Sequence, residues 1–490
     1  MQSPRPENIK RRRDGIIRHF TVISNGYPSG MKSHTHQIED IKPHRGVFQM
    51  LDVFRPIFSW DYTKKYWLAG VILIAMLCLS PIFHAYFNGN LIFKSDGGAW
   101  AIASNLVGGK GYSGCATDYF PNCESTSQAT AMREPIPVLL IALARLFHPT
   151  KLSALIMQSL YYLGSIPAIY LTLKESSRNV KTALLGTLMW TFSVPVINQV
   201  DNGSGDLAAA FFFSFGMYFF LRGYHASKAK DWVISGLFFG LAALSRTVLL
   251  GVGIGLGAVM LAKKWFETRP FSKKQIGGIL LFLVSLFLVF SPWVIRNTLV
   301  FGQPVIGSSL TGYNIYRMNF IVANADFQPH YVGAKEGYAA VRDLLSHSTL
   351  TGLENEAQLQ SIYMKAGLQL ITQHPIEYLQ LVLYRFLPLW FNVSVNEAYG
   401  AGYYMADYLS YVQQFLFLLA VLFGISKHWR SMWPFILALA LGCGAYMAID
   451  AQMRYLVDLM PAVVILSAAG LGSLMPQNEM KINRSLDGLA

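Results

Sequence analysis

Acidic and basic side chains gather at the ends of apolar stretches in this chain, on one predicted side of a membrane. They are Asp96, Arg133, Glu134, Asp201, Asp206, Arg246, Arg296, Asp450 and Arg454. Charges beside membrane-spanning segments are costly and usually serve a function. Guanidinium groups bind phosphates in a planar, paired fashion and stabilise a departing negative charge. A carboxylate opposite them can accept the proton of an attacking hydroxyl group. The combination suits transfer of a group from a lipid phosphate.

Several of these residues also have a simpler structural interpretation. Asp96, in the sequence "KSDGGAW", is either a catalytic base or the N-cap of the helix that follows. Asp206 has the same two roles open to it, and "DNGSGD" offers Asp201 as an alternative acid. Arg246 either binds a ligand or extends to the membrane boundary. Because positive residues are less expected on the outer side, Arg296 and Arg454 favour ligand binding.

The composition excludes a soluble globular protein. Of 490 residues, 53% are hydrophobic and only 14% are charged, which is too apolar for a soluble chain of this length. The formal net charge of +13 comes from short basic clusters between apolar runs, as in the cytoplasmic loops of membrane proteins. The charge therefore indicates membrane topology and no nucleic-acid partner.

Apolar runs predict an all-α polytopic membrane protein with about ten spans, and up to thirteen, oriented by Lys and Arg. The spans are 67–87, 152–174, 180–198, 206–222, 231–246, 248–263, 275–295, 406–425, 432–449 and 455–475. Both termini are then cytoplasmic. Two further apolar stretches, 134–151 and 374–391, are predicted as juxtamembrane helices, the second with a hairpin as the alternative.

These spans divide the chain into five parts. The parts are a basic cytoplasmic arm at 1–66, a transmembrane core at 67–295 with a first external loop at 88–151, an external segment at 296–405, C-terminal transmembrane helices at 406–475, and a cytoplasmic tail at 476–490. The polar stretch 320–373 has helical periodicity and predicts a small external helical cap.

Cysteine and histidine give weaker signals. Cys115 and Cys123 share a predicted external loop, where an oxidising compartment permits a disulfide, and two free thiols are the alternative. His330, His347 and His374 match no metal-binding spacing, so no metal ligands are predicted. A divalent cation, Mg²⁺ or Mn²⁺, bridging Asp96 and a phosphate is chemically compatible with the site.

Six segments occur in an order that resembles the GT-C glycosyltransferases. They are "SDGGAWAIASNLVGGKGYSG", "TAMREPIPVLLIALARLF", "GLAALSRTVLL", "SPWVIRNTLVFGQPVIGSSLTGYNIYRMN", "ITQHPIEYLQLVLYRFLPLW" and "AQMRYLVDLMPAVVILSAAGL". The set is similar to glycosyltransferase family 39, the dolichyl-phosphate-mannose protein mannosyltransferase-like proteins, and more distantly to lipid A aminoarabinose transferases. The resemblance covers about residues 67 to 475.

The resemblance implies a GT-C fold, a polyprenyl-phosphate-linked sugar as donor, and inversion at the anomeric carbon. It aligns Asp96 with the catalytic base of the first external loop. It also places Arg133, Arg246, Arg296 and Arg454 on recurrent basic positions that face the donor phosphate, and Asp206 on an acidic position at the outer start of a span. We expect their neighbours Glu134 and Asn297 to bind substrate as well. The chain departs from the family where a proline pair and tyrosine become Glu134-Pro135-Ile136-Pro137, which leaves the acceptor contacts open.

We therefore expect an integral membrane glycosyltransferase of a bacterial inner membrane, with its active site on the external, periplasmic face. Its partners would be membrane lipids, a polyprenyl-phosphate sugar and a hydroxyl acceptor on a protein, a lipid or a polysaccharide. The alternatives are a transporter or flippase of lipid-linked sugars, which would use the same polar cluster to bind cargo, and a non-catalytic scaffold subunit.

Overall fold

The computed structural model describes residues 62–91, 98–117, 119–121, 123, 127–266 and 273–475. These ranges are helical, and within them the pairing of extended backbone is limited to an isolated bridge between Ser113 and Ala129. Residues 1–61 of the predicted arm and the predicted tail lie outside the described residues. So does Asp96, in the segment 92–97.

Five helices in these ranges are long and apolar enough to cross a membrane. They are α3 (Tyr62–Phe87), α6 (Leu152–Ser177), α9 (Asp206–Ala226), α12 (Lys273–Phe301) and α19 (Met405–His428). Shorter apolar helices accompany them: α5 (Pro135–Phe147), α11 (Val248–Phe266), α20 (Trp433–Ile449) and α21 (Met460–Gly472). An all-helical membrane protein is thereby confirmed, and the number of spans stays a prediction.

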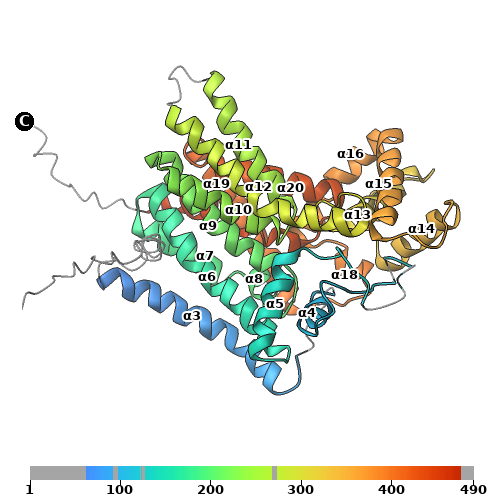
Figure 1. Cartoon of the computed structure of the whole chain (residues 1–490). Coiled ribbons are helices and arrows are strands. Elements are labelled where there is room, and N and C mark those ends of the chain that lie inside the picture. The colour runs from blue at the N-terminus through green and yellow to red at the C-terminus, as the bar shows by residue number, and fades with distance from the viewer. Residues whose placement is uncertain are drawn as a thin grey trace, which may run out of the picture. The chain divides into compact units, whose positions relative to one another are not determined.

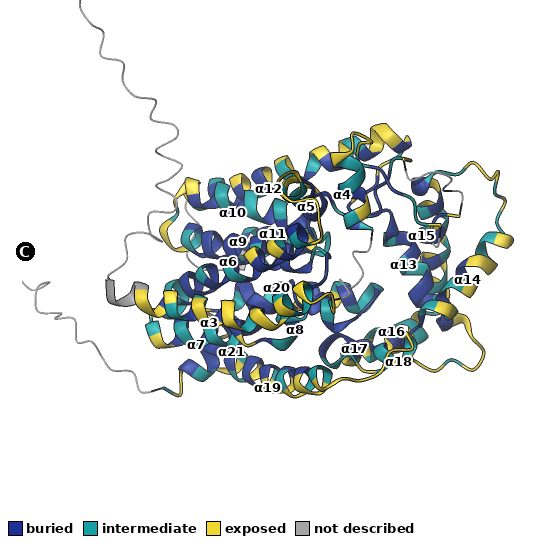
Figure 2. Ribbon diagram, turned by 90° about the horizontal axis from the view of Figure 1, so that it is seen from below, coloured by how far each residue is buried: buried dark blue, intermediate teal, exposed yellow. Residues whose placement is uncertain are grey.

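The long helices differ in how much surface they bury. In α9, 83% of an apolar stretch of 18 residues is buried. Its side chains are apolar on every side, as expected for a helix enclosed by others. In α3 only 22% of the corresponding 18-residue stretch is buried, and exposed segments follow the helix in Figure 2. Its large apolar side chains Leu73 and Leu77 are exposed. In a bilayer such side chains contact lipid, whereas in water they would form an aggregation-prone patch.

The core is built from α9 between α6 and α10 (Ala229–Ala243), with α10 packed on α12. Phe220 of α9 meets Trp232 of α10 and Phe282 of α12 edge to face, with ring centroids 5.2 and 5.5 Å apart. Gly236 allows the close approach of α10 to α12, because a Cβ at this position would collide with the carbonyl oxygen of Phe282. Large aromatic rings beside a glycine thus fix the spacing of these helices.

Three predicted spans end or break where polar residues are needed. The span 180–198 is divided into α7 (Val180–Thr191) and α8 (Val194–Ile197), with Pro195 in the first turn of α8. The span 231–246 ends at Ala243, which leaves Arg246 in the connection to α11. The span 455–475 becomes helical only at Met460, after the 3-10 helix η2 (Met453–Leu456). Arg246 therefore lies in the connection from α10 to α11 and Arg454 lies in η2, between α20 and α21.

The helices between α12 and α19 lie together with α4 (Ala99–Val107) at one end of the helical bundle in both views (Figure 1, Figure 2). They are α13 (Leu310–Asn319), η1 (Phe320–Ala323), α14 (Ala334–Ser346), α15 (Glu356–Gln373), α16 (Pro375–Tyr384), α17 (Phe386–Phe391) and α18 (Val395–Ala398). The helical periodicity read from the sequence corresponds to α15, which begins with a capping box between Asn355 and Gln358.

Candidate active site

Arg246 is held by a buried carboxylate. It follows the end of α10 and forms an ion pair with Asp206, the first residue of α9. The Asp206 side chain has no exposed surface and also accepts a hydrogen bond from Ser204 Oγ at 2.6 Å, while 18% of the Arg246 side chain is exposed. Because a buried carboxylate needs its partner, this pair fixes the guanidinium group while leaving part of it accessible.

Arg454 lies beside Arg246 on the ring of Tyr455. The guanidinium carbon of Arg246 is 5.3 Å from the ring centroid and that of Arg454 is 4.9 Å from it. Arg454 also donates from Nη2 to the Tyr455 hydroxyl oxygen at 3.0 Å. The π electrons of one ring attract both cations, so Tyr455 gathers two positive groups from segments more than 200 positions apart.

Tyr455 is itself held from two directions. Its hydroxyl group donates to Asp450 Oδ2 at 3.1 Å. Its ring stacks on that of Tyr446, with centroids 5.2 Å apart and planes 14° apart. The hydroxyl group of Tyr446 in turn donates to the fully buried carboxyl group of Asp458. Two buried acids therefore fix the aromatic pair behind the arginines.

Arg133 completes the cluster from the first loop. Burial is the largest influence on its guanidinium group and lowers its pKa, and the charges of Arg246 and Arg454 lower the pKa further. The adjacent Glu134 precedes α5 and accepts a hydrogen bond from Thr247 Oγ1 at 3.2 Å. Because Thr247 is the neighbour of Arg246, this contact joins the first loop to the connection that carries Arg246.

The charges in this cluster are arranged asymmetrically. Asp206, Asp450 and Asp458 are at most 4% exposed, whereas Arg133, Arg246 and Arg454 are all partly accessible. Asp450 is also paired elsewhere, with Arg317 Nη2 at 3.5 Å and with the hydroxyl group of Tyr331 at 3.0 Å. Among the described residues, Glu134 is the one partly exposed acid beside the three guanidinium groups, so the accessible side of the cluster keeps a positive balance suited to an anion such as a phosphate.

Arg296 lies in a different environment. Its guanidinium group donates to the carbonyl oxygens of Thr130 at 2.8 Å and Tyr112 at 3.1 Å, and to Asn297 Oδ1 at 2.9 Å. Asn297 in turn donates to the carbonyl oxygen of Val305 at 3.1 Å. These two residues, both expected to bind substrate, attach the first loop and the chain after α12 to that helix.

Glu356 holds the same loop from the opposite direction. This residue, the first of α15, accepts hydrogen bonds from Thr130 Oγ1 at 2.6 Å, Ala131 N at 2.9 Å and Ser309 Oγ at 2.7 Å. Burial raises the pKa of Glu356 and outweighs these hydrogen bonds, which lower it. Arg296 and Glu356 thus fix the backbone at Thr130, three residues before Arg133.

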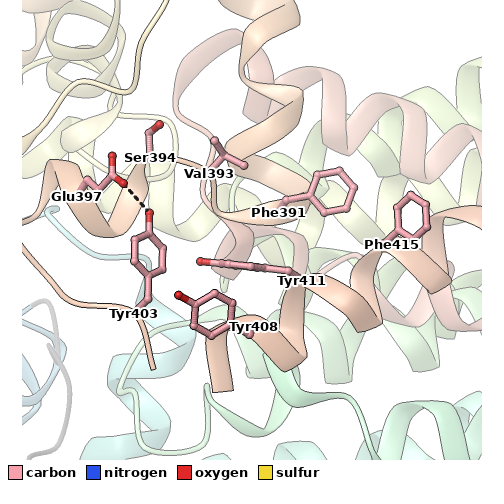
Figure 3. A pocket seen from close by; sticks show the side chains of 8 residues that line it. All are labelled: Phe391, Val393, Ser394, Glu397, Tyr403, Tyr408, Tyr411 and Phe415. Atoms are coloured by element: carbon pink, nitrogen blue, oxygen red, sulfur yellow. Dashed lines mark hydrogen bonds between the residues drawn. The ribbon is translucent and has the colours of Figure 1, made fainter. Parts of the chain in front are cut away.

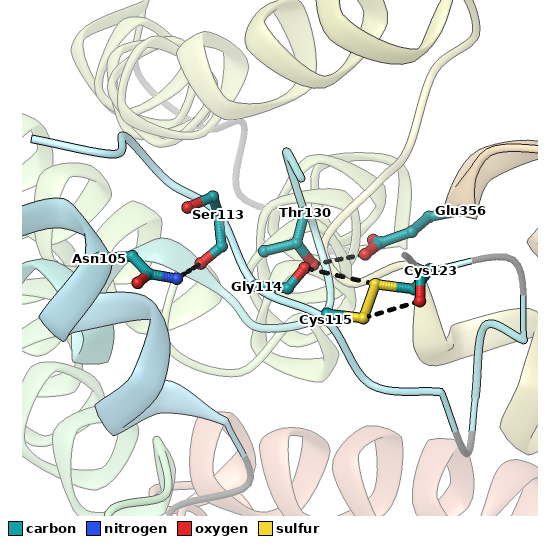
Figure 4. The surroundings of a disulfide bond; sticks show 7 residues. All are labelled: Asn105, Ser113, Gly114, Cys115, Cys123, Thr130 and Glu356. Atoms are coloured by element: carbon teal, nitrogen blue, oxygen red, sulfur yellow. Dashed lines mark hydrogen bonds between the residues drawn. A yellow bond between two sulfur atoms is a disulfide. The ribbon is translucent and has the colours of Figure 1, made fainter. Parts of the chain in front are cut away.

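A disulfide bond lies in the same loop. Cys115 and Cys123 are joined in the structure, and Thr130 and Glu356 lie close by (Figure 4). Between the two cysteines, Tyr119 packs edge to face on Tyr313 of α13, with ring centroids 5.1 Å apart. Burial lowers the pKa of Arg133, and the electrostatic interaction with Tyr119 acts in the opposite direction. The disulfide-closed loop therefore packs on α13 through Tyr119.

The remaining expected site residues are placed as follows. Asp96 lies outside the described residues, and Asp201 is buried near the start of α9. Among the residues that the structure describes, no group of three or more His, Cys, Asp or Glu side chains is arranged to hold a metal ion. The predicted cation site at Asp96 lies outside the described residues.

Glu356 and Tyr455 were not selected from the sequence as site residues. Glu356 had a recognisable signal, because an acid at the first position of a helix with a capping box is well placed to accept hydrogen bonds from a neighbouring loop. Tyr455 had only its position next to Arg454. Its partners Tyr446 and Asp450 are near in the sequence, but Arg246 is not.

Comparisons with known proteins give a family match over part of the chain and a fold. Residues 135–295 match the profile of the family described as dolichyl-phosphate-mannose-protein mannosyltransferase. No curated protein sequence matches the chain. The matched segment contains Asp206 and Arg246, and the other residues of the cluster lie outside it.

Solved structures match most of the chain at low sequence identity. The archaeal oligosaccharyltransferase AglB from Archaeoglobus fulgidus, in complex with an inhibitory peptide and a dolichol-phosphate, is 14% identical, with a TM-score of 0.52 over 84% of this chain and 51% of that chain. The apo form of the Archaeoglobus fulgidus enzyme is 12% identical, with a TM-score of 0.50 over 85% of this chain and 51% of that chain. ArnT from Cupriavidus metallidurans, bound to undecaprenyl phosphate, is 13% identical, with a TM-score of 0.38 over 83% of this chain and 78% of that chain.

The chain thus spans about half the length of the oligosaccharyltransferase structures. At these identities the likeness concerns the fold. The resemblance to the GT-C glycosyltransferases, expected from six sequence segments, is therefore confirmed in the fold and, over residues 135–295, in the sequence.

Proposed function

We propose that this chain is an integral membrane glycosyltransferase that moves a sugar from a polyprenyl phosphate to a hydroxyl acceptor. The observation that carries the proposal is that Arg246 and Arg454 meet on the ring of Tyr455, while the hydrogen bond from Thr247 to Glu134 brings the loop that carries Arg133 to the same connection. We place this site at the external face of a bacterial inner membrane. Asp206 and Glu134 offset part of the repulsion between these guanidinium groups, and an anionic ligand would offset the rest.

A lipid phosphate fits the chemistry of the cluster. Each guanidinium group can donate two parallel hydrogen bonds to phosphate oxygens, and Tyr455 restricts the orientation of two of the three groups. As the bond between the anomeric carbon and the phosphate oxygen breaks, negative charge grows on the departing prenyl phosphate. Fixed guanidinium groups stabilise that charge without reorganising, which is the main electrostatic contribution expected here.

Asp96 is the proposed base. The acceptor oxygen forms a bond to the anomeric carbon, its proton passes to the Asp96 carboxylate, and the prenyl phosphate leaves from the opposite face, which inverts the configuration. Gly98, two residues later, packs directly on Met132, since a Cβ on Gly98 would lie 2.6 Å from Met132 Cε. Two peptide units limit the distance between the Cα atoms of residues 96 and 98 to about 7.6 Å. Because Met132 precedes Arg133, this tether supports a base near the cluster.

The comparisons support this donor class. The family description for residues 135–295 names dolichyl-phosphate-mannose as a substrate, and the AglB structure, which shares the fold, contains a dolichol-phosphate. For this chain the donor lipid, the sugar and the acceptor are part of the proposal. Arg296 and Asn297 are assigned a positioning role, because their polar groups bind the backbone of the first loop and of the chain after α12.

The experiment that tests the proposal is sugar transfer by purified protein in detergent. Polyprenyl-phosphate-mannose serves as the donor probe, and release of free polyprenyl phosphate is measured with and without a hydroxyl acceptor. We expect turnover by the native chain, loss of turnover in Asp96→Asn, and native turnover in Asp326→Asn, a matched change at an exposed acid on the outer segment. Full activity of Asp96→Asn removes the proposed base.

The same experiment separates an enzyme from a transporter. Detergent micelles have no second compartment, so a flippase can bind the donor but cannot move it. Binding of the donor without any release of polyprenyl phosphate would contradict the glycosyltransferase and favour transport. Donor binding to the native chain must therefore be measured alongside turnover.

A further inference from the structure

A cavity that no arginine lines lies where α17 and α18 meet the start of α19. Its volume is about 530 Å³, and the side chains around it are drawn in Figure 3. The lining residues are Phe391, Val393, Ser394, Glu397, Tyr403, Tyr408, Tyr411 and Phe415. None of these residues has a part in the proposed transfer reaction.

The cavity has two chemically different ends. Phe391 and Phe415 line the apolar end, whereas Ser394, Glu397 and Tyr403 gather at the other (Figure 3). There the Tyr403 hydroxyl group donates to Glu397 Oε1 at 3.3 Å. This separation of polar from apolar walls fits an amphiphile, with its head group at Glu397 and its chain toward the phenylalanines.

One wall of the cavity belongs to the lipid-facing surface. Tyr408 and Phe415 are seven residues apart on the long apolar helix α19, so they share one helix face, and both side chains are more than half exposed. Leu409, Val412 and Leu416 are exposed beside them. Tyrosines at the end of such a helix are typical of the membrane–water boundary. A ligand from the bilayer can therefore enter this cavity directly.

The charge at the polar end selects a cation. In the described part of the chain, no basic side chain lies within ion-pair distance of Glu397, and no basic residue lines the cavity. The faces of tyrosine rings attract positive charge, and Tyr403, Tyr408 and Tyr411 lie with ring centroids 6.1 to 6.4 Å apart. A lipid phosphate as the group facing Glu397 would be repelled, whereas an ammonium group would be attracted.

We propose that this cavity binds the ammonium head group of a phospholipid, with the ammonium group at Glu397 among the tyrosine rings. The site is separate from the arginine cluster but adjoins it. Tyr399, the residue after α18, accepts a hydrogen bond from Gln452 Nε2 at 3.4 Å, and Gln452 also donates to Tyr331, the partner of Asp450. The lipid site therefore borders the network that holds Tyr455.

The test uses the full chain and lipids of defined head group. Protein is purified in detergent, incubated with an equimolar mixture of phosphatidylethanolamine and phosphatidylglycerol, and the lipids that stay bound through gel filtration are quantified by mass spectrometry. N-acetylated phosphatidylethanolamine, which lacks the positive charge, is the matched lipid control. The variants are Glu397→Gln and Tyr408→Ala, with Tyr404→Ala as the control, because Tyr404 is exposed at the same boundary but does not line the cavity.

We expect the native chain to retain phosphatidylethanolamine in preference to phosphatidylglycerol. In Glu397→Gln the ratio of the two retained lipids should fall at least about fivefold, as expected for a lost cation contact. N-acetylation of the lipid should have the same effect on the native chain. Glu397→Gln is nearly isosteric, so it tests the site even if Tyr408→Ala fails to fold. Equal retention of the two lipids by the native chain, or an unchanged preference in Glu397→Gln, would overturn the proposal. Both outcomes are independent of sugar transfer.

Discussion

Arg454→Gln separates ligand binding from folding more cleanly than any other change in the cluster. In the described residues, Arg454 donates to the Tyr455 hydroxyl oxygen at 3.0 Å and lies over the Tyr455 ring. It holds no buried carboxylate directly, because Asp206 is paired with Arg246. Removing Arg454 therefore leaves no buried charge without a partner.

The expected magnitudes follow from these contacts. Folding loses one hydrogen bond and one cation–π contact, together about 1–2 kcal/mol. The substitution also removes an attraction to Asp206 and a repulsion from Arg246, which act in opposite directions. Binding of a phosphate loses a charged hydrogen-bond donor, which contributes about 1.5–3 kcal/mol. That range corresponds to a roughly 10- to 150-fold weaker affinity for the lipid phosphate.

The measurement is the Kd of polyprenyl phosphate for the purified chain in detergent, by calorimetry, together with the melting temperature. Arg342→Gln is the matched control, because Arg342 is an exposed arginine on α14 and the change removes the same charge. An unchanged Kd in Arg454→Gln would refute the assigned phosphate contact. An equal loss in Arg342→Gln would show that net charge, and not the cluster, attracts the lipid.

Three further outcomes follow from the buried contacts. Arg246→Gln should destabilise the fold by about 3–5 kcal/mol, because it leaves Asp206 charged and buried without a partner. Thermal unfolding should show that adding Asp206→Asn restores part of this stability. Burial raises the pKa of Glu356 in the folded chain, so the stability that its protonation contributes is fully present below the ordinary pKa of about 4.3 and is lost as pH rises through the higher folded pKa. The melting temperature of Glu356→Gln should lack this decrease when it is measured across the same pH range. Reducing the disulfide between Cys115 and Cys123 should cost about 2–3 kcal/mol, measured by denaturant unfolding with and without reductant.

Much of the fold could be predicted from the sequence, because membrane-spanning helices leave a strong local signal. The runs that became α3, α6, α9, α12 and α19 are long and apolar, and the predicted spans fall within these helices. The exact ends of the helices could not be predicted as well, because they depend on tertiary contacts. The break before α8, for example, is stabilised by a hydrogen bond from Val194 N to Gln413 of α19, more than 200 residues away.

The residues of the candidate site could be selected from the sequence only in part. Arg133, Arg246 and Arg454 could be selected because charged residues at span ends are rare and costly. Arg296 satisfied the same criterion, yet its guanidinium group binds backbone carbonyl oxygens of the first loop. Sequence position cannot distinguish an arginine of the proposed phosphate site from one that binds loop backbone, since the difference lies in which distant loop packs against it. The same limit applies to Tyr455, whose contact with Arg246 exists only in the folded chain.

The most direct test of the proposed phosphate site is a cryo-EM structure of the chain with bound polyprenyl phosphate. We predict that the phosphate oxygens lie within about 3 Å of the guanidinium nitrogens of Arg133, Arg246 and Arg454. A phosphate bound elsewhere, with these three side chains turned away from it, would contradict this site.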